Sequence, residues 1–165
     1  MMYIMSLLEN MDLEKTMSHI LVQTAYANGG SIKFLEENEI NHTLVPTGVK
    51  NAHPVAIQYA IGANDEPNGH GTITVDWDKL EECLGDKADS VYAKKLKAFL
   101  RISNFYVGDA VANLLLVEAA LRAKNYSIDN FCNLYKENAN KMFKIQVKDR
   151  TAFKTIWDES RLTEP

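Results

Sequence analysis

The stretch from His19 to Gly48, HILVQTAYANGGSIKFLEENEINHTLVPTG, decides the fold of this chain. It begins with a short apolar strand over residues 19–24 and turns at Asn28-Gly-Gly-Ser31, whose serine is a good N-cap for a helix over 32–38. A second short strand over 42–45 ends at a proline and a glycine. This order of strand, turn, helix and strand is typical of a βαβ unit, so it predicts an α/β domain with a parallel pair of strands.

The sequence beyond this unit adds further strands and helices. Residues 60–64 and 72–75 have the pattern of short strands, which predicts a small mixed sheet of about four strands flanked by helices. Pro54 fits the first turn of a helix that continues to about Ala60. The charged residues 76–92 predict a connection with one short helix, and a longer helix follows over 91–102.

Two later segments carry clear apolar patterns. A helix over 106–124 places Leu114 and Leu115 on a broad apolar face, so we expect it to be among the most buried elements. Ser127 should cap a further short helix. Phe143 to Lys148 alternates apolar residues with basic or polar ones, which predicts an antiparallel strand at the edge of the sheet.

Composition limits the classes of function. Hydrophobic residues make up 46% and charged residues 24% of the 165 residues, which is the composition of one folded domain. A net charge of −4 gives no basic surface for nucleic acid or an anionic membrane, and no apolar run is long enough to span a bilayer. Two cysteines and an N-terminus without the features of a signal peptide predict a cytoplasmic protein.

The densest group of chemically able side chains is Glu66-Pro-Asn68-Gly69-His70-Gly71. Its glycines allow the backbone to approach a ligand closely, and its polar side chains can donate to and accept from sugar hydroxyls. A polyhydroxylated ligand therefore fits this loop. On pattern alone, a plain polar turn between two strands is the favoured interpretation.

Two other segments could bind an anion. In Thr47-Gly48-Val-Lys50, with His53 three residues further on, the side chains lie at the start of a helix and could hold a phosphate. Ala27-Asn-Gly-Gly-Ser31 could form an anion-binding turn. A helix entry with a solvated lysine and a plain turn remain the respective alternatives. We identify no catalytic residue, no metal-ligand cluster and no phosphate-binding P-loop in the sequence.

The residues themselves resemble a known family. Gln23-Thr-Ala-Tyr-Ala-Asn-Gly-Gly-Ser31, Thr47-Gly-Val-Lys50 and Glu66-Pro-Asn-Gly-His-Gly-Thr72 are similar, in that order, to stretches of phosphoacetylglucosamine mutases of the α-D-phosphohexomutase superfamily. The resemblance continues through Val107-Gly-Asp-Ala110 and Lys144-Ile-Gln-Val147 to the end of the chain. It implies the third of four domains in an isomerase that interconverts N-acetylglucosamine 6-phosphate and 1-phosphate for UDP-N-acetylglucosamine synthesis.

The resemblance also implies how the catalytic and binding roles are divided among the four domains. In the family, the first domain carries a phosphoserine, the second holds Mg²⁺ and the fourth clamps the substrate phosphate. None of those motifs occurs here, so this chain alone should be inactive. The third domain supplies the sugar-binding loop, which implies that Glu66 and Asn68 hold ring hydroxyls beside His70. Asn64 and Asp65 stand where the family has apolar or aromatic strand residues, which predicts a looser strand before the loop.

The expected organisation and partners follow from this resemblance. Residues 1–17 would be a helix trailing from the preceding domain, 18–150 the sugar-binding domain and 151–165 a linker toward the last domain. The expected partners are a hexosamine phosphate and the remaining mutase domains, in cis or in trans, without nucleic acid or membrane. The alternative is a stand-alone, non-catalytic module that binds a sugar phosphate or another protein. We expect no cofactor in this chain, because Mg²⁺ belongs to another domain of the family enzyme.

Overall fold

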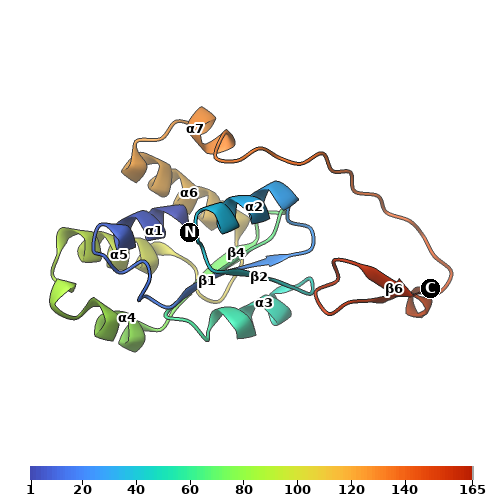
Figure 1. The fold of residues 1–165 in the computed structure, drawn as a ribbon, viewed down its shortest axis with the longest axis horizontal. Helices are drawn as coiled ribbons and strands as arrows, with labels where there is room; N and C mark the ends of the chain where they lie inside the picture. Colours follow the sequence, from blue (N-terminus) through green and yellow to red (C-terminus); the bar gives the residue numbers. More distant parts are fainter. Residues whose placement is uncertain (165) are drawn as a thin grey trace.

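The computed structural model describes residues 1–164 of the chain. Within them, a four-stranded sheet is surrounded by helices, and a small two-stranded hairpin lies apart near the C-terminus (Figure 1). The helices and strands, in chain order, are α1 (Met2–Glu9), β1 (His19–Thr24), α2 (Gly29–Glu37), β2 (His42–Val45), α3 (Val49–Ala56), β3 (Ile61–Asp65), β4 (Gly71–Val75), α4 (Trp77–Leu84), α5 (Val91–Ile102), α6 (Ala110–Lys124), α7 (Ile128–Cys132), β5 (Lys154–Thr155) and β6 (Leu162–Glu164).

The main sheet has the strand order β2-β1-β3-β4. β1 pairs in parallel with both β2 and β3, so that Val22 lies between Thr43 and Asn64. β4 then returns antiparallel to β3, with Asn64 opposite Thr72. The predicted α/β class and the mixed four-stranded sheet are confirmed. Because β1, β2 and β3 run in the same direction, the loops that follow them meet at one edge of the sheet.

The helices cover the two faces of the sheet unequally. α1, α2 and α6 lie on the face opposite to α3 (Figure 1). On the α3 side, Ile20 and Val22 pack with Val45, Ala52 and Ala56 in a small buried cluster. The larger cluster contains α1, α4 and α5, and several of its side chains are fully enclosed. These include Ile4, Leu8, Ile61, Leu80 and Leu96.

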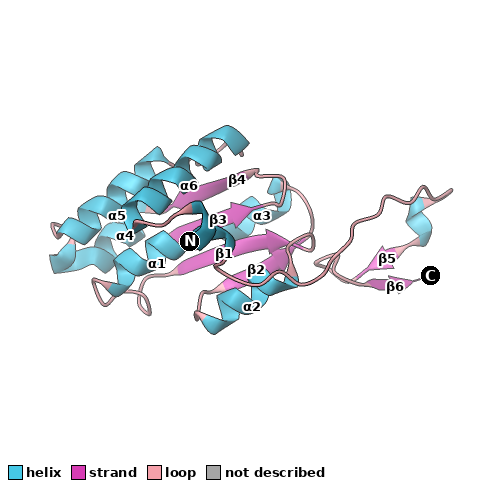
Figure 2. Cartoon of the chain, turned by 90° about the horizontal axis from the view of Figure 1, so that it is seen from above, coloured by secondary structure: helices cyan, strands magenta, loops and turns pink. Residues whose placement is uncertain are grey.

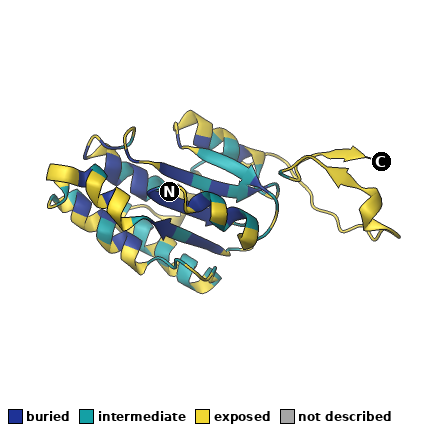
Figure 3. Cartoon of the chain, turned by 90° about the horizontal axis from the view of Figure 1, so that it is seen from below, coloured by how far each residue is buried: buried dark blue, intermediate teal, exposed yellow. Residues whose placement is uncertain are grey.

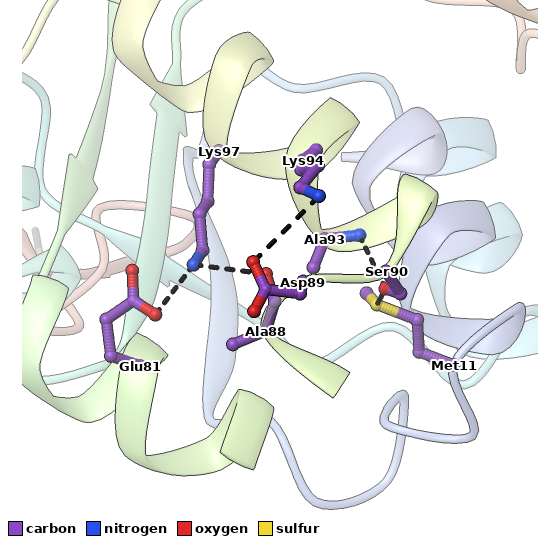
Figure 4. A network of polar contacts seen from close by, with 8 residues as sticks. All are labelled: Met11, Glu81, Ala88, Asp89, Ser90, Ala93, Lys94 and Lys97. Carbon is purple, nitrogen blue, oxygen red and sulfur yellow. Dashed lines mark hydrogen bonds and ion pairs between the residues drawn. The ribbon is translucent and has the colours of Figure 1, made fainter. Parts of the chain in front are cut away.

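Polar contacts connect the layer of helices α4 and α5. The Lys97 ammonium lies 2.7 Å from Glu81 Oε2 and 3.4 Å from the Ala88 carbonyl oxygen, so it joins α5 to α4 and to the turn between them (Figure 4). Ser90 caps α5 by accepting from the Ala93 N–H at 3.1 Å. A partly buried ammonium with two acceptors contributes more to stability than an exposed ion pair, which contributes at most about 1 kcal/mol. This contact fixes α5, on which α1 packs.

The prediction that the helix over 106–124 is among the most buried elements is wrong for the outer face of this helix. α6 begins only at Ala110, because the Asn104 side chain accepts from the Tyr106 and Val107 N–H groups in a turn. Leu121 is buried, whereas Leu114 and Leu115 are 67% and 66% exposed. The helix is apolar around most of its circumference, so its sequence could not indicate which side meets this chain.

The expected edge strand over Phe143 to Lys148 is also wrong. Residues 136–147, called the strap below, contain neither helix nor strand and leave Phe143 and Ile145 more than 70% exposed (73% and 78%). Figures 2 and 3 show the chain leaving the domain along this path to the fully exposed β5–β6 hairpin. Alternation predicts a strand only where another strand can pair with it. Between residues 136 and 147 the described chain offers no such partner.

Two local expectations also need correction. α3 begins at Val49 rather than near Pro54, because Gly48 takes a φ of 113° that turns the chain directly into the helix. Pro54 therefore lies inside α3. β3 is not loosened by its polar residues: it pairs along its whole length, and the Asn64 side chain is buried and donates to the Thr72 hydroxyl. Within residues 1–164 no helix combines the length and apolar character that a membrane crossing requires.

The two faces of α6 give a direct test of this packing. Leu121→Ala should lower the free energy of unfolding by about 2–5 kcal/mol, because it leaves a cavity in the core. Leu114→Ala on the same helix should change it by no more than about 0.5 kcal/mol. Urea titration followed by circular dichroism measures both. Equal losses in the two variants would contradict the exposed position of Leu114.

Candidate functional site

The loop between β3 and β4 is a tight hairpin whose backbone is internally hydrogen bonded. The Gly69 N–H donates to the Glu66 carbonyl at 2.9 Å, and the Glu66 N–H donates to the His70 carbonyl at 2.9 Å. Pro67 occupies the second position of the turn, where its fixed φ is favourable. Gly69 follows with a φ of 86°, a value that favours glycine. Pro67 thus helps to preorganise the loop.

The start of α6 holds this loop from behind. The Asn113 side-chain amide donates to the Gly69 carbonyl at 2.9 Å and to the Gly71 carbonyl at 3.1 Å. Gly108 lies against the same place, since a Cβ there would be 3.3 Å from the Gly71 nitrogen. Asn113 is not among the site residues predicted from the sequence. The available signal was a single amide side chain among the apolar residues of α6.

The loop between β2 and α3 lies beside the hairpin. Thr47 lines a cavity of about 320 Å³ together with Glu66, Pro67 and Asn68. Gly48 and Glu66 line a second, narrow hollow. The structure thus brings together two of the predicted segments, at the edge of the sheet where parallel strands end.

Other predicted site residues lie differently. Lys50 and His53 are on α3 and line neither of these hollows. The His53 ring instead packs edge-on against Phe105, with 5.8 Å between ring centroids. The His70 side chain is exposed beside the turn, and its backbone N–H donates to Asn68 Oδ1 at 2.9 Å.

The β1–α2 turn forms the opposite side of a larger cavity. Tyr26 and Asn28 line this cavity of about 650 Å³, and Asp65, Glu66 and Pro67 lie across from them. The Gly30 N–H of this turn is already occupied, because it donates to Asn28 Oδ1 at 2.8 Å as part of the α2 N-cap. The turn therefore acts as a helix cap with a polar face toward the cavity.

The polar groups of the hairpin remain available for a ligand. Within the described chain, the contact of the Glu66 carboxylate with another side chain is a long one, 3.4 Å from the Asn68 amide nitrogen. The preceding Asp65 lies at the end of β3 with part of its surface exposed, and partial desolvation of its carboxyl raises the pKa to about 6. The site thus offers acceptors and donors, with reduced negative charge near pH 6. Within residues 1–164, no group of three or more His, Cys, Asp and Glu side chains could hold a metal ion.

Solved structures identify the class of this fold. A crystal structure of an N-acetylglucosamine-phosphate mutase, a member of the α-D-phosphohexomutase superfamily, in its substrate complex superimposes with a TM-score of 0.87 and 35% identity, covering 99% of this chain and 32% of that one. An Aspergillus fumigatus N-acetylphosphoglucosamine mutase in complex with GlcNAc-6P and magnesium gives a TM-score of 0.88 and 30% identity, covering 99% and 31% of the two chains. The fold is that of a phosphohexomutase domain.

Sequence relatives give the family. The family model described as phosphoacetylglucosamine mutase AMG1, domain III, matches residues 1–126. Phosphoacetylglucosamine mutases of Oryza sativa subsp. japonica and Homo sapiens are 36% and 35% identical, each match covering 88% of this chain and 28% of the relative. The chain belongs to the phosphoacetylglucosamine mutase family, as its domain III. It spans less than a third of the length of these relatives.

The raised pKa of Asp65 predicts a pH dependence of stability. Because the folded pKa of about 6 is above the ordinary aspartate pKa of 3.8, the folded state favours the protonated carboxyl. This contribution to stability is complete below pH 4 and is lost as the pH rises through 6. Asp65→Asn should remove that decline, so the variant gains stability relative to the parent chain between pH 4 and 7. Urea titrations at several pH values measure it, and parallel pH profiles for both proteins would contradict the assignment.

Proposed function

We propose that this chain is the sugar-binding domain of a phosphoacetylglucosamine mutase, with the Glu66–Gly71 hairpin as the loop that holds the sugar ring. The observation that carries the proposal is the geometry of this hairpin. Its backbone groups are hydrogen bonded within the turn and to Asn113, while the Glu66 carboxylate remains free for a ligand. Membership of the domain III family supports the same assignment.

The proposed substrate is a hexosamine phosphate, N-acetylglucosamine 6-phosphate or 1-phosphate. A carboxylate and an amide side by side, as in Glu66 and Asn68, can accept from and donate to neighbouring ring hydroxyls. Thr47 and Gly48 each line one of the two hollows that Glu66 borders and would extend the polar contacts. Lys50 and His53 stay outside these hollows, so we assign the sugar rather than the phosphate to this domain.

The remaining mutase domains are the proposed partners, in cis or in trans. Val111, Leu114 and Leu115 form an exposed apolar strip on α6, and Phe143 and Ile145 extend exposed apolar surface into the strap. Apolar surface of this extent is typical of a region that another domain covers. It favours the domain interpretation over the stand-alone module. The group that transfers the phosphoryl moiety and the ligands of Mg²⁺ are assigned to those other domains.

Glu66→Ala in the complete enzyme that contains this chain tests the assignment. A charge-assisted hydrogen bond contributes roughly 1.5–3 kcal/mol, so kcat/KM should fall about ten- to a hundredfold. Glu82→Ala is the matched control, because Glu82 is an exposed glutamate on α4, away from the loop. A coupled assay for the 1-phosphate product measures both variants. Unchanged kinetics for Glu66→Ala would remove this residue from the site.

The isolated chain should be inactive and should bind the sugar phosphate weakly. A few hydrogen bonds from Glu66, Asn68 and His70 have a gross value of roughly 4–8 kcal/mol, which association largely cancels. We expect a dissociation constant of about a millimolar or weaker. Calorimetric titration with N-acetylglucosamine 6-phosphate measures it. Micromolar affinity, or turnover by the chain alone, would show that the site is complete without other domains.

A further inference from the structure

One side chain fastens the strap to the domain. The Asn28 amide nitrogen donates to the Asn138 carbonyl at 3.0 Å, and the Asn138 N–H donates back to Asn28 Oδ1 at 2.9 Å. Asn28 thus pairs with the strap backbone as a neighbouring strand would. Within the described chain, these are the hydrogen bonds that join residues 136–147 to the rest of the domain.

A glycine makes this contact possible. A Cβ on Gly30 would lie 2.3 Å from the Lys136 carbonyl oxygen, a backbone atom that cannot move without displacing the strap. At the neighbouring Gly29, a Cβ would meet only the end of the Asn138 side chain, at 2.9 Å. The rings of Phe34 and Tyr135, 5.9 Å apart, add an apolar contact just before the strap begins.

The fastened strap forms a wall of the candidate site. Asn138, Asn140 and Met142 line the cavity of about 650 Å³, opposite Glu66 and Pro67. Met142 also lines the smaller cavity next to Asn68 and Thr47. Beyond the strap, the Glu159 carboxylate accepts from the Thr47 N–H at 3.0 Å, so the C-terminal segment reaches the loops at the ends of both β1 and β2.

We propose that Asn28 and Gly30 are positioning residues that latch the strap against the β1–α2 turn, so that the strap becomes one wall of the sugar site. The proposal rests on the proposed function for the identity of the ligand. The strap is otherwise exposed and contributes little to the core, so its position depends on a few contacts at the latch. The sequence of this turn indicated either an anion site or a plain turn, and it gave no sign of the contact with the strap.

The rate of tryptic cleavage within the strap measures how firmly the strap is attached to the domain, and it does not depend on enzyme activity. Lys136 and Lys141 lie at and within the latched segment and are exposed. Gly30→Ala should increase cleavage at these lysines about tenfold, an effect of the size expected for one lost hydrogen bond. Gly29→Ala is the matched control and should stay within about twofold of the parent chain. Unchanged cleavage in Gly30→Ala, or an equal increase in Gly29→Ala, would overturn the latch.

Asn28→Asp provides a second variant that does not depend on the glycine. An aspartate keeps the acceptor for the Gly30 N–H, and it is as good an N-cap as asparagine. It loses the donor to the Asn138 carbonyl and places a charge against that oxygen. Cleavage should therefore rise as in Gly30→Ala, while the urea midpoint stays unchanged. A fall in the midpoint without faster cleavage would mean that Asn28 acts only as a helix cap.

Steady-state kinetics in the complete enzyme test the role of the strap as a wall of the site. Gly30→Ala and Asn28→Asp should raise KM for N-acetylglucosamine 6-phosphate about three- to tenfold and leave kcat within about twofold, because a wall binds ground state and transition state alike. Faster cleavage with unchanged KM would overturn this proposal while the effect of Glu66→Ala stands. If Glu66→Ala is without effect, the proposed function fails, and the cleavage results still decide whether the latch exists.

Discussion

The parallel pairing of β1 with strands on both of its sides is the constraint on which the rest of this structure depends. It forces β2 and β3 to end at the same edge as β1, which brings three loops into one region. Gly62 makes the arrangement compact, because a Cβ there would lie 2.1 Å from the Ala56 carbonyl oxygen. The end of α3 therefore rests directly on β3. At the other end of α3, the β2–α3 loop lies beside the β3–β4 hairpin, where Gly48 and Glu66 line one hollow.

The buried apolar cluster that stabilises the domain and the hairpin of the candidate site are separate parts of the structure. The large cluster around Ile4, Leu8 and Leu96 carries most of the buried apolar surface, and it contains no residue of the Glu66–Gly71 hairpin. The hairpin is stabilised instead by hydrogen bonds, from its own backbone and from Asn113. Polar contacts can fix a loop without burying its side chains. The loop backbone is thereby fixed while the Glu66 side chain, the proposed sugar ligand, makes only one long side-chain contact.

The sequence predicted what depends on local pattern. The four strands of the main sheet, their mixed arrangement and the hairpin loop followed from apolar runs and glycine turns within a few residues of one another. The errors concern surroundings that pattern does not contain. Leu114 and Phe143 have patterns typical of buried elements, yet both are exposed, because apolar periodicity indicates that a face needs a partner and not which chain supplies it. The contacts of Asn113 and Asn28 could not be predicted for a related reason: each side chain bonds a segment distant in sequence.

The proposed latch and the hairpin are two backbone segments beside the cavity that are fixed in the same way. Each fixes backbone with a carboxamide that bonds main-chain groups, Asn113 to the hairpin and Asn28 to the strap. An asparagine side chain can donate and accept at once, so it can replace a neighbouring strand where the sheet has ended. Fixing these walls before the ligand arrives reduces the ordering cost of binding. Under the proposed function, a domain that makes few contacts with a sugar can then still hold its ring in a defined place.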